Sequence, residues 1–241
     1  MVTTMSDRWS SIPDQLQMLD LYRFARMFYR DQLMVRPYEW AARHLRRHGL
    51  GHALEVDAGW KIGYAPDEPA YLVDRLRWLE FDDEVILTSG LAVVADNGCL
   101  VDRYRDCLTF VARDSALAEV GFVGQGRHDV GYLDIPESAI YRKSETLIGV
   151  AEQQWELSNG AVPVIVDGPM AALAVRAAGG EAAEWVGIAV RGGTMTRLQA
   201  SFLDHYAASE SVIVALGGDS VRRRASVELL PESRPSRWRR P

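Results

Sequence analysis

The stretch PVIVDGPMAALAVRAAGGEAAEWVGIAV, residues 163–190, decides how the C-terminal half of the chain folds. It holds two continuous apolar runs, 164–166 and 186–190, and between them a helical repeat of apolar residues that begins at Met170. A third apolar run, 212–216, follows another segment of helical periodicity. Continuous runs rich in β-branched residues that alternate with helical segments are typical of a buried parallel sheet with crossover helices. We therefore expect an α/β fold here.

An acidic residue follows the first and the third of these runs. Asp167 comes directly after 164–166, and Asp219 comes after 212–216 and the pair Gly217-Gly218. In a parallel sheet, ligands bind beyond the carboxyl ends of the strands. We therefore expect Asp167 and Asp219 to face each other across that edge. The glycine pair is either a backbone nest for an anion or a tight turn at the strand end.

The composition excludes several classes of protein. The chain has 241 residues, of which 48% are hydrophobic, a net charge of −6 and a mean hydropathy of −0.12. No apolar run reaches the ~18 residues of a membrane span, and the N-terminus lacks the apolar region of a signal peptide. The only cysteines, Cys99 and Cys107, lack metal-ligand spacing, so we expect no zinc site and a reduced, cytoplasmic compartment. The charge argues against a uniformly basic nucleic-acid binder but permits a basic patch.

Helices are expected first along the chain. Apolar residues at helical spacing predict a helix from Pro13, a second from Pro37 to Gly49, and a short helical segment near 69–79. The composition shifts near residue 150, where we place a domain boundary. The expected parts are a loose N-terminus, a subdomain of helices and antiparallel strands, a parallel-sheet domain and a basic tail, at residues 1–12, 13–150, 151–230 and 231–241.

Strands are expected from Gly90 onward. Asn97-Gly98 tolerates the positive φ of a tight turn and predicts a hairpin. A second strand pair is expected at 108–113 and 119–123. We predict that residues 90–125 form one small antiparallel platform, followed by a loop-rich stretch.

Five stretches resemble motifs of one family and occur in that family's order. They are FARMFYRDQLMVRPYEWAARHLRRHGL at 24–50, IGYAPD at 62–67, DRYRDCLTFVARD at 102–114, VGFVGQGR at 120–127 and YLDIPESAIYRKSETLIGV at 132–150. Together they resemble the catalytic core of bacterial DnaG-type replicative primases. The resemblance extends over about residues 20–230, and five motifs in order are far more specific than one glycine-rich turn.

The resemblance implies a TOPRIM fold for 162–230, preceded by a basic subdomain at 13–150. The family holds divalent metal with a glutamate after the first strand and an Asp-x-Asp pair after the third. Asp167 stands at the glutamate position, and of the pair only Asp219 remains, because its first member is Gly217. A further acidic position of the family falls on Ala171. Two-metal catalysis needs several carboxylates, whereas one Mg²⁺ often binds through one or two carboxylates and substrate phosphates. We therefore expect weak Mg²⁺ or Mn²⁺ binding by Asp167 and Asp219, with catalysis weak or lost.

The resemblance also implies a basic groove for nucleotide phosphates and the template strand. Its expected residues are Arg103, Arg105, Arg127 and Lys143. Outside its motif, each would be an ordinary surface charge. Asp134 replaces a usual asparagine and Gly131 a usual lysine, which makes this part of the groove less basic. The arginines at 222–224 and in the tail either bind nucleic acid or are solvated.

Three functions remain open at this point. The first is a primase, a nucleotidyltransferase that makes short RNA primers from nucleoside triphosphates on single-stranded DNA during replication. The second is a catalytically impaired primase-like module that binds single-stranded nucleic acid or a replisome partner. The third, and least favoured, is a TOPRIM nuclease. The family's zinc-ribbon and helicase-binding domains have no counterpart in this sequence, so we expect separately encoded partners, as in a phage or mobile element.

Overall fold

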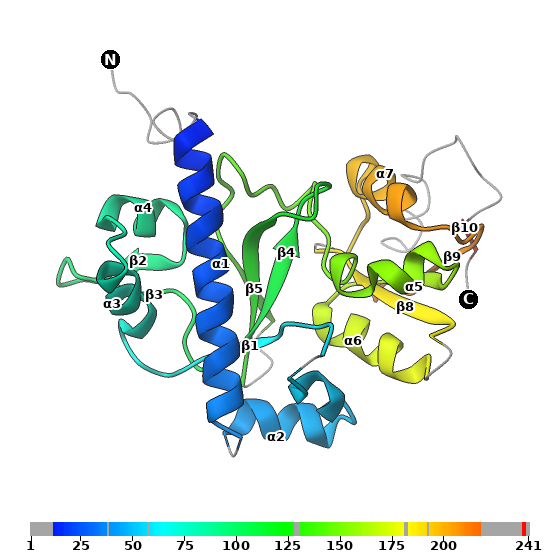
Figure 1. Cartoon of the computed structure of the whole chain (residues 1–241), viewed down its shortest axis with the longest axis horizontal. Coiled ribbons are helices and arrows are strands. Elements are labelled where there is room, and N and C mark those ends of the chain that lie inside the picture. The colour runs from blue at the N-terminus through cyan, green and yellow to red at the C-terminus, as the bar shows by residue number, and fades with distance from the viewer. Residues whose placement is uncertain are drawn as a thin grey trace.

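The computed structural model describes residues 12–37, 39–56, 58–127, 131–180, 183–191, 193–217 and 238–239. Helix α1 (Ile12–Val35) crosses an antiparallel sheet, and a parallel sheet with its helices lies beside that sheet (Figure 1). The expected α/β class, a platform followed by a helix-flanked parallel sheet, is confirmed. The predicted loose N-terminus and basic tail lie outside the described residues, apart from Ile12 and 238–239.

Helix α1 forms because one face of it is apolar. Its buried residues recur every three or four positions and include Leu21, Tyr22, Ala25, Tyr29 and Leu33. This face packs on the antiparallel sheet. The packing is close at Gly63, where a Cβ atom would collide with the Cβ of Tyr29. Glycine is therefore required at this crossing.

The antiparallel sheet has the order β1-β4-β5-β6. Its strands are β1 (Gly63–Ala65), β4 (Cys107–Arg113), β5 (Glu119–Gly126) and β6 (Tyr132–Asp134). The hairpin of β4 and β5 confirms the second predicted strand pair, with Cys107 opposite Gly126 at one end. The edge strands β1 and β6 were not predicted, because three residues are too few to show a strand period.

The prediction of one platform over 90–125 is wrong in part. Strands β2 (Ala92–Val94) and β3 (Leu100–Asp102) form the expected hairpin, but as a separate two-stranded sheet. This hairpin packs with α3 (Tyr71–Trp78) and α4 (Asp83–Thr88). The carboxylate of Asp102 accepts hydrogen bonds from the backbone N–H groups of Leu72 and Val73, at 2.8 and 2.9 Å. The hairpin is thus joined to the start of α3 rather than to the larger sheet.

The second predicted helix is shorter than expected. Helix α2 spans Trp40–Arg47, because Glu39 is extended (φ −66°, ψ 161°) and stops the helix from beginning at Pro37. A 3₁₀ turn, η2 (Gly51–Leu54), follows it. A second turn, η3 (Ala151–Gln153), leads into α5 (Gln154–Ser158).

The predicted parallel sheet is present. Its order is β10-β9-β7-β8, with strands β7 (Val162–Val166), β8 (Trp185–Ala189), β9 (Val212–Val214) and β10 (Trp238–Arg239) all parallel. Helices α6 (Pro169–Ala178) and α7 (Arg197–Tyr206) connect them. Thr196 and Gln199 form a capping box at the start of α7, and Pro169 occupies the first turn of α6.

The antiparallel sheet and the parallel sheet contribute residues to one apolar core. Residues of the parallel sheet, among them Val164, Val166 and Ala189, belong to the same apolar cluster as α1 and β4. Backbone hydrogen bonds between Ile148 and Ala189 tie the connecting segment to β8. The apolar core continues across residue 150. The domain boundary that we place near this residue therefore stays a prediction.

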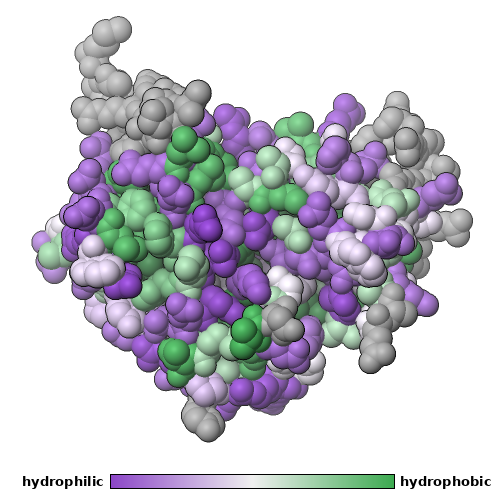
Figure 2. Space-filling model, viewed as in Figure 1, coloured by the Kyte–Doolittle hydropathy of each residue, from purple (hydrophilic) through white to green (hydrophobic). Residues whose placement is uncertain are grey.

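Exposed apolar side chains occur in both halves of the molecule, and those of the parallel-sheet half include Trp185 of β8 and Leu198 of α7. On the face that Figure 2 shows, one hydrophobic patch lies on the side of the molecule where α1 and α4 lie. The exposed apolar residues of α1 include Phe24 and Met27, and the ring of Phe24 packs edge-on against Phe81. Within the described ranges, no helix is long and apolar enough to cross a membrane.

Candidate active site

The carboxyl edge of the parallel sheet holds the first predicted site residue. Asp167 follows β7 directly, and its side chain is exposed. Its Oδ2 atom accepts a hydrogen bond from the backbone N–H of Gly217, three residues beyond β9, at 3.2 Å. The ends of β7 and β9 are therefore neighbours, as their parallel pairing also shows. Asp219 lies outside the described residues, so the facing pair Asp167 and Asp219 stays a prediction.

An ion cluster lies where the antiparallel sheet meets this edge. Arg191, two residues beyond β8, donates from Nε to Oδ1 of Asp134 at 3.0 Å and from Nη2 to Oδ2 at 3.3 Å. Lys143 Nζ lies 3.0 Å from the same Oδ2. Two cations from different segments thus share one carboxylate. We call Tyr132, Asp134, Lys143, Asp167 and Arg191 the junction cluster.

Strand geometry explains how the cluster forms. Tyr132 and Asp134 are two residues apart on β6, so their side chains leave the same face of the sheet. The guanidinium of Arg191 stacks on the ring of Tyr132, 4.4 Å from its centroid, and its Nη1 donates to the backbone carbonyl of Asp167 at 3.4 Å. Tyr132 also packs on Gly168, where a Cβ atom would collide with its ring. The cluster therefore joins β6 to the turn after β7.

The four predicted basic residues have different surroundings. Lys143 belongs to the junction cluster. The Nε of Arg103 donates to the carbonyl of Gly90 at 2.5 Å, which is a structural contact. Arg105 is exposed and pairs with Asp67 at 2.8 Å.

Arg127 is exposed at the end of β5, and it forms no ion pair with any residue that the structure describes. Because Cys107 pairs with Gly126, Arg105 and Arg127 flank the same end of the β4–β5 hairpin. Strand β6 pairs beside them, with Tyr132 opposite Gln125. This end of the sheet leads from the two arginines towards the junction cluster.

Sequence reasoning missed Arg191 and Tyr132. Arg191 follows the apolar run 186–190 at the same edge as Asp167, and that position was the available signal. Asp134 was noted only as a loss of positive charge, whereas in the structure it holds two cations.

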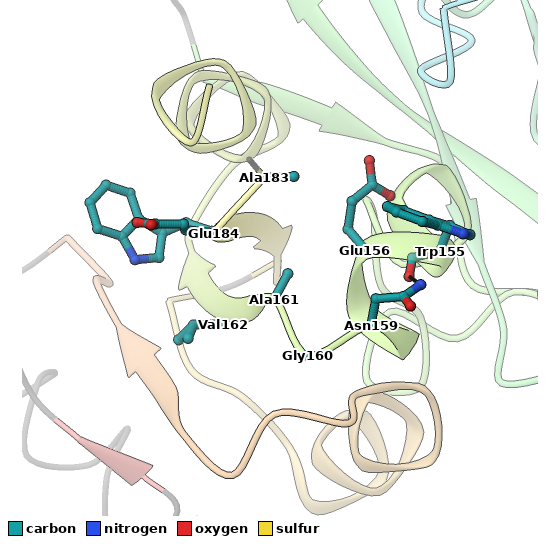
Figure 3. Close-up of a pocket in the computed structure, with 9 residues that line it drawn as sticks. Trp155, Glu156, Asn159, Gly160, Ala161, Val162, Ala183 and Glu184 are labelled. Carbon is teal, nitrogen blue, oxygen red and sulfur yellow. Dashed lines mark hydrogen bonds between the residues drawn. The ribbon is translucent and has the colours of Figure 1, made fainter. Parts of the chain in front are cut away.

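A cavity of about 470 Å³ lies at the opposite, amino-terminal edge of the parallel sheet. Figure 3 shows Trp155 and Glu156 of α5, with Asn159 at its end, on one side of the opening and Ala183 and Glu184 on the other side. Val162 begins β7 at this edge. The cavity is therefore separated from Asp167 by the length of the strands. Two of the predicted site residues, Asp167 and Lys143, lie in the junction cluster instead.

Comparison with known proteins identifies the family. A family model described as DNA primase catalytic core, N-terminal domain, matches residues 28–154, more than half of the chain. The chain belongs to this DNA primase family. The DNA primase of Deinococcus radiodurans is 30% identical over 187 residues, which are 76% of this chain and 32% of that protein. The chain spans about a third of the length of the curated primases it matches.

Solved primase structures share the fold. The structure described as the E. coli primase catalytic core aligns with a TM-score of 0.73 and 25% identity, covering 92% of this chain and 71% of that chain. A structure of the DnaG primase catalytic domain bound to ssDNA aligns with a TM-score of 0.67 and 24% identity, covering 89% and 66%. The predicted resemblance to the primase core is thus confirmed for most of the chain.

The described residues alone do not build the metal site that the primase family implies. They contain no group of three histidine, cysteine or acidic side chains able to hold an ion. Both oxygens of Asp134 already accept from cations. Asp167 is exposed and accepts from one amide, so it is the carboxylate of the junction cluster with room for a metal. Further ligands would have to come from Asp219 or from a bound phosphate.

Proposed function

We propose that this chain is a DNA primase core that synthesises short RNA primers on single-stranded DNA during replication. The observation that carries the proposal is the junction cluster, which places Lys143 and Arg191 beside the carboxyl edge that bears Asp167. Cations at such an edge suit a triphosphate, and a carboxylate suits the divalent metal that accompanies it. The cytoplasm is the compartment that this reaction implies.

The proposal assigns roles to individual residues. Asp167 and Asp219 hold one Mg²⁺ or Mn²⁺ together with substrate phosphates, on a sheet that we assign to the TOPRIM type. Lys143 contacts nucleotide phosphate. Arg105 and Arg127 contact the template strand, and the ssDNA-bound relative supports a single-stranded template. Arg103 supports the fold instead, because its side chain bonds a backbone carbonyl.

A second function is favoured by one observation. Gly217 stands where the family has a metal-binding aspartate, and its backbone N–H donates a hydrogen bond to an oxygen of Asp167. Both features weaken a metal site. The alternative is therefore a primase-like module that binds single-stranded nucleic acid without catalysis.

A primer-synthesis assay separates the two functions. Purified chain is incubated with single-stranded DNA, the four ribonucleoside triphosphates and Mn²⁺ or Mg²⁺, and labelled products are resolved by length. The primase predicts metal-dependent short products that fall at least about 100-fold in Asp167→Asn, because that carboxylate positions the metal. Template binding that persists without any product would favour the binding module. Asp83→Asn, an exposed residue of α4, is the matched control.

A further inference from the structure

Asp134 is the centre of the junction cluster, and its two cations are held very differently. Arg191 is fixed by two bonds to Asp134, by its stack on Tyr132 and by the carbonyl of Asp167. Its side chain is only 11% exposed. Among the described residues, the Nζ of Lys143 pairs with one group, Oδ2 of Asp134, and the Lys143 side chain is 39% exposed. Lys143 is therefore the member that can leave.

The charges of the cluster oppose the binding of an anion. Lys143 and Arg191 carry two positive charges, and Asp134 and Asp167 carry two negative charges, so their sum is zero. An incoming phosphate must compete with Asp134 for the ammonium of Lys143. It also approaches a carboxylate that is only 18% exposed and therefore weakly screened. Charge-assisted hydrogen bonds are stronger than neutral ones. Breaking the bond between Lys143 and Asp134 therefore weakens the binding of the phosphate.

We propose that Asp134 is a specificity-determining residue that holds Lys143 away from phosphate until a polyphosphate displaces it. The inference rests on the proposed function for the identity of the ligand, a nucleoside triphosphate. Arg191 stays in place on Tyr132, and Lys143 turns from Asp134 to the phosphate. A single phosphate binds poorly because its ion pair with Lys143 only replaces the equally strong pair between Lys143 and Asp134. A triphosphate carries enough charge to compete.

The backbone around Lys143 supports this motion. The carbonyl of Lys143 accepts from Gln199 Nε2 at 3.0 Å, and its N–H donates to Glu137 at 3.2 Å. Gln199 is buried in the capping box of α7. The main chain is thus anchored while the side chain end is exposed. A change of partner at Nζ needs only side-chain rotation.

The test is calorimetric titration of the whole chain with inorganic triphosphate, in EDTA and at fixed ionic strength. Asp134→Asn keeps the size of the side chain and removes its charge. We expect it to lower the dissociation constant for triphosphate about tenfold. Asp83→Asn opens an arginine–aspartate pair elsewhere with the same change in net charge, and we expect less than a twofold effect. The gain should vanish in Asp134→Asn/Lys143→Ala, which shows that Lys143 carries it.

Several results would overturn the inference. If the affinity for triphosphate is unchanged or weaker in Asp134→Asn, Asp134 only positions the two cations and the inference is wrong. The inference is also wrong if neither wild type nor Asp134→Asn binds triphosphate. If Asp134→Asn does not fold, Asp134→Glu retains the charge and must keep wild-type affinity within about twofold. Triphosphate binding needs no template, metal or turnover, so the primer-synthesis assay can fail while this inference holds, or the reverse.

Discussion

In the function that we propose, Gly217 decides between catalysis and binding alone. Its φ is not in the left-handed region, so an L-residue meets no backbone penalty there. A Cβ atom at 217 would lie 2.6 Å from Oδ2 of Asp167. That oxygen ends an exposed side chain that can rotate away. The missing aspartate can therefore be restored in the folded chain.

We expect Gly217→Asp to lower the free energy of unfolding by up to about 1 kcal/mol without metal, because it adds a carboxylate beside Asp167. Millimolar Mg²⁺ or Mn²⁺ should recover that loss. Binding to the folded state alone contributes about 2.7 kcal/mol at a metal concentration of 100 Kd. Thermal melting of wild type and variant, with metal and with EDTA, measures both effects.

Gly217→Ala is the control for this substitution, since it adds the same Cβ atom without charge. Its melting temperature should not respond to metal more than that of wild type. If wild type is already stabilised by several kcal/mol and Gly217→Asp gains nothing further, the metal site is complete and our account of Gly217 is wrong.

The start of α3 depends on an unusual helix cap. Asp102 lies on β3, is 5% exposed, and accepts from two N–H groups in the first turn of α3. Burial raises the pKa of Asp102 to about 6, although its hydrogen bonds with Leu72 and Val73 act in the opposite direction. The folded chain therefore binds a proton at Asp102 more tightly than the unfolded chain does.

This pKa predicts the sign of a pH effect. Between about pH 4 and pH 6 the unfolded chain loses the proton of Asp102 first, so the contribution of this residue to stability falls as the pH rises. Urea unfolding of wild type and Asp102→Asn across this range measures the effect. The free energy of unfolding of wild type, relative to that of Asp102→Asn, should fall as the pH rises and level off above pH 6. A difference that is constant with pH would show that Asp102 titrates normally in the fold.

The molecule as a whole shows where sequence reasoning succeeds. The parallel sheet and the β4–β5 hairpin were predictable, because continuous β-branched runs and paired strands with a turn are local patterns. The junction cluster was not. Asp134 and Arg191 are 57 residues apart, and their meeting depends on how two sheets pack. Strand β6, which carries Asp134, has three residues and no recognisable period.

The packing of the two sheets also ranks the predicted nucleic-acid contacts. Lys143 is engaged by Asp134 and Arg105 by Asp67, whereas Arg127 pairs with no described residue. Arg127 is therefore the side chain that can take a phosphate without breaking an ion pair. We expect Arg127→Ala to weaken single-stranded DNA binding more than Lys143→Ala does.

Salt dependence gives this ranking a direct measure. Each phosphate contact to a single strand changes the slope of log K against log salt by about −0.7. We expect Arg127→Ala to flatten the slope by about that amount, as measured by fluorescence anisotropy of a labelled oligonucleotide at several salt concentrations. Arg75→Ala, an exposed arginine that lies over Trp78 on α3, removes the same charge and should leave the slope unchanged. If both slopes equal that of wild type, the phosphates are bound elsewhere, and the arginines at 234–240 become the residues to replace next.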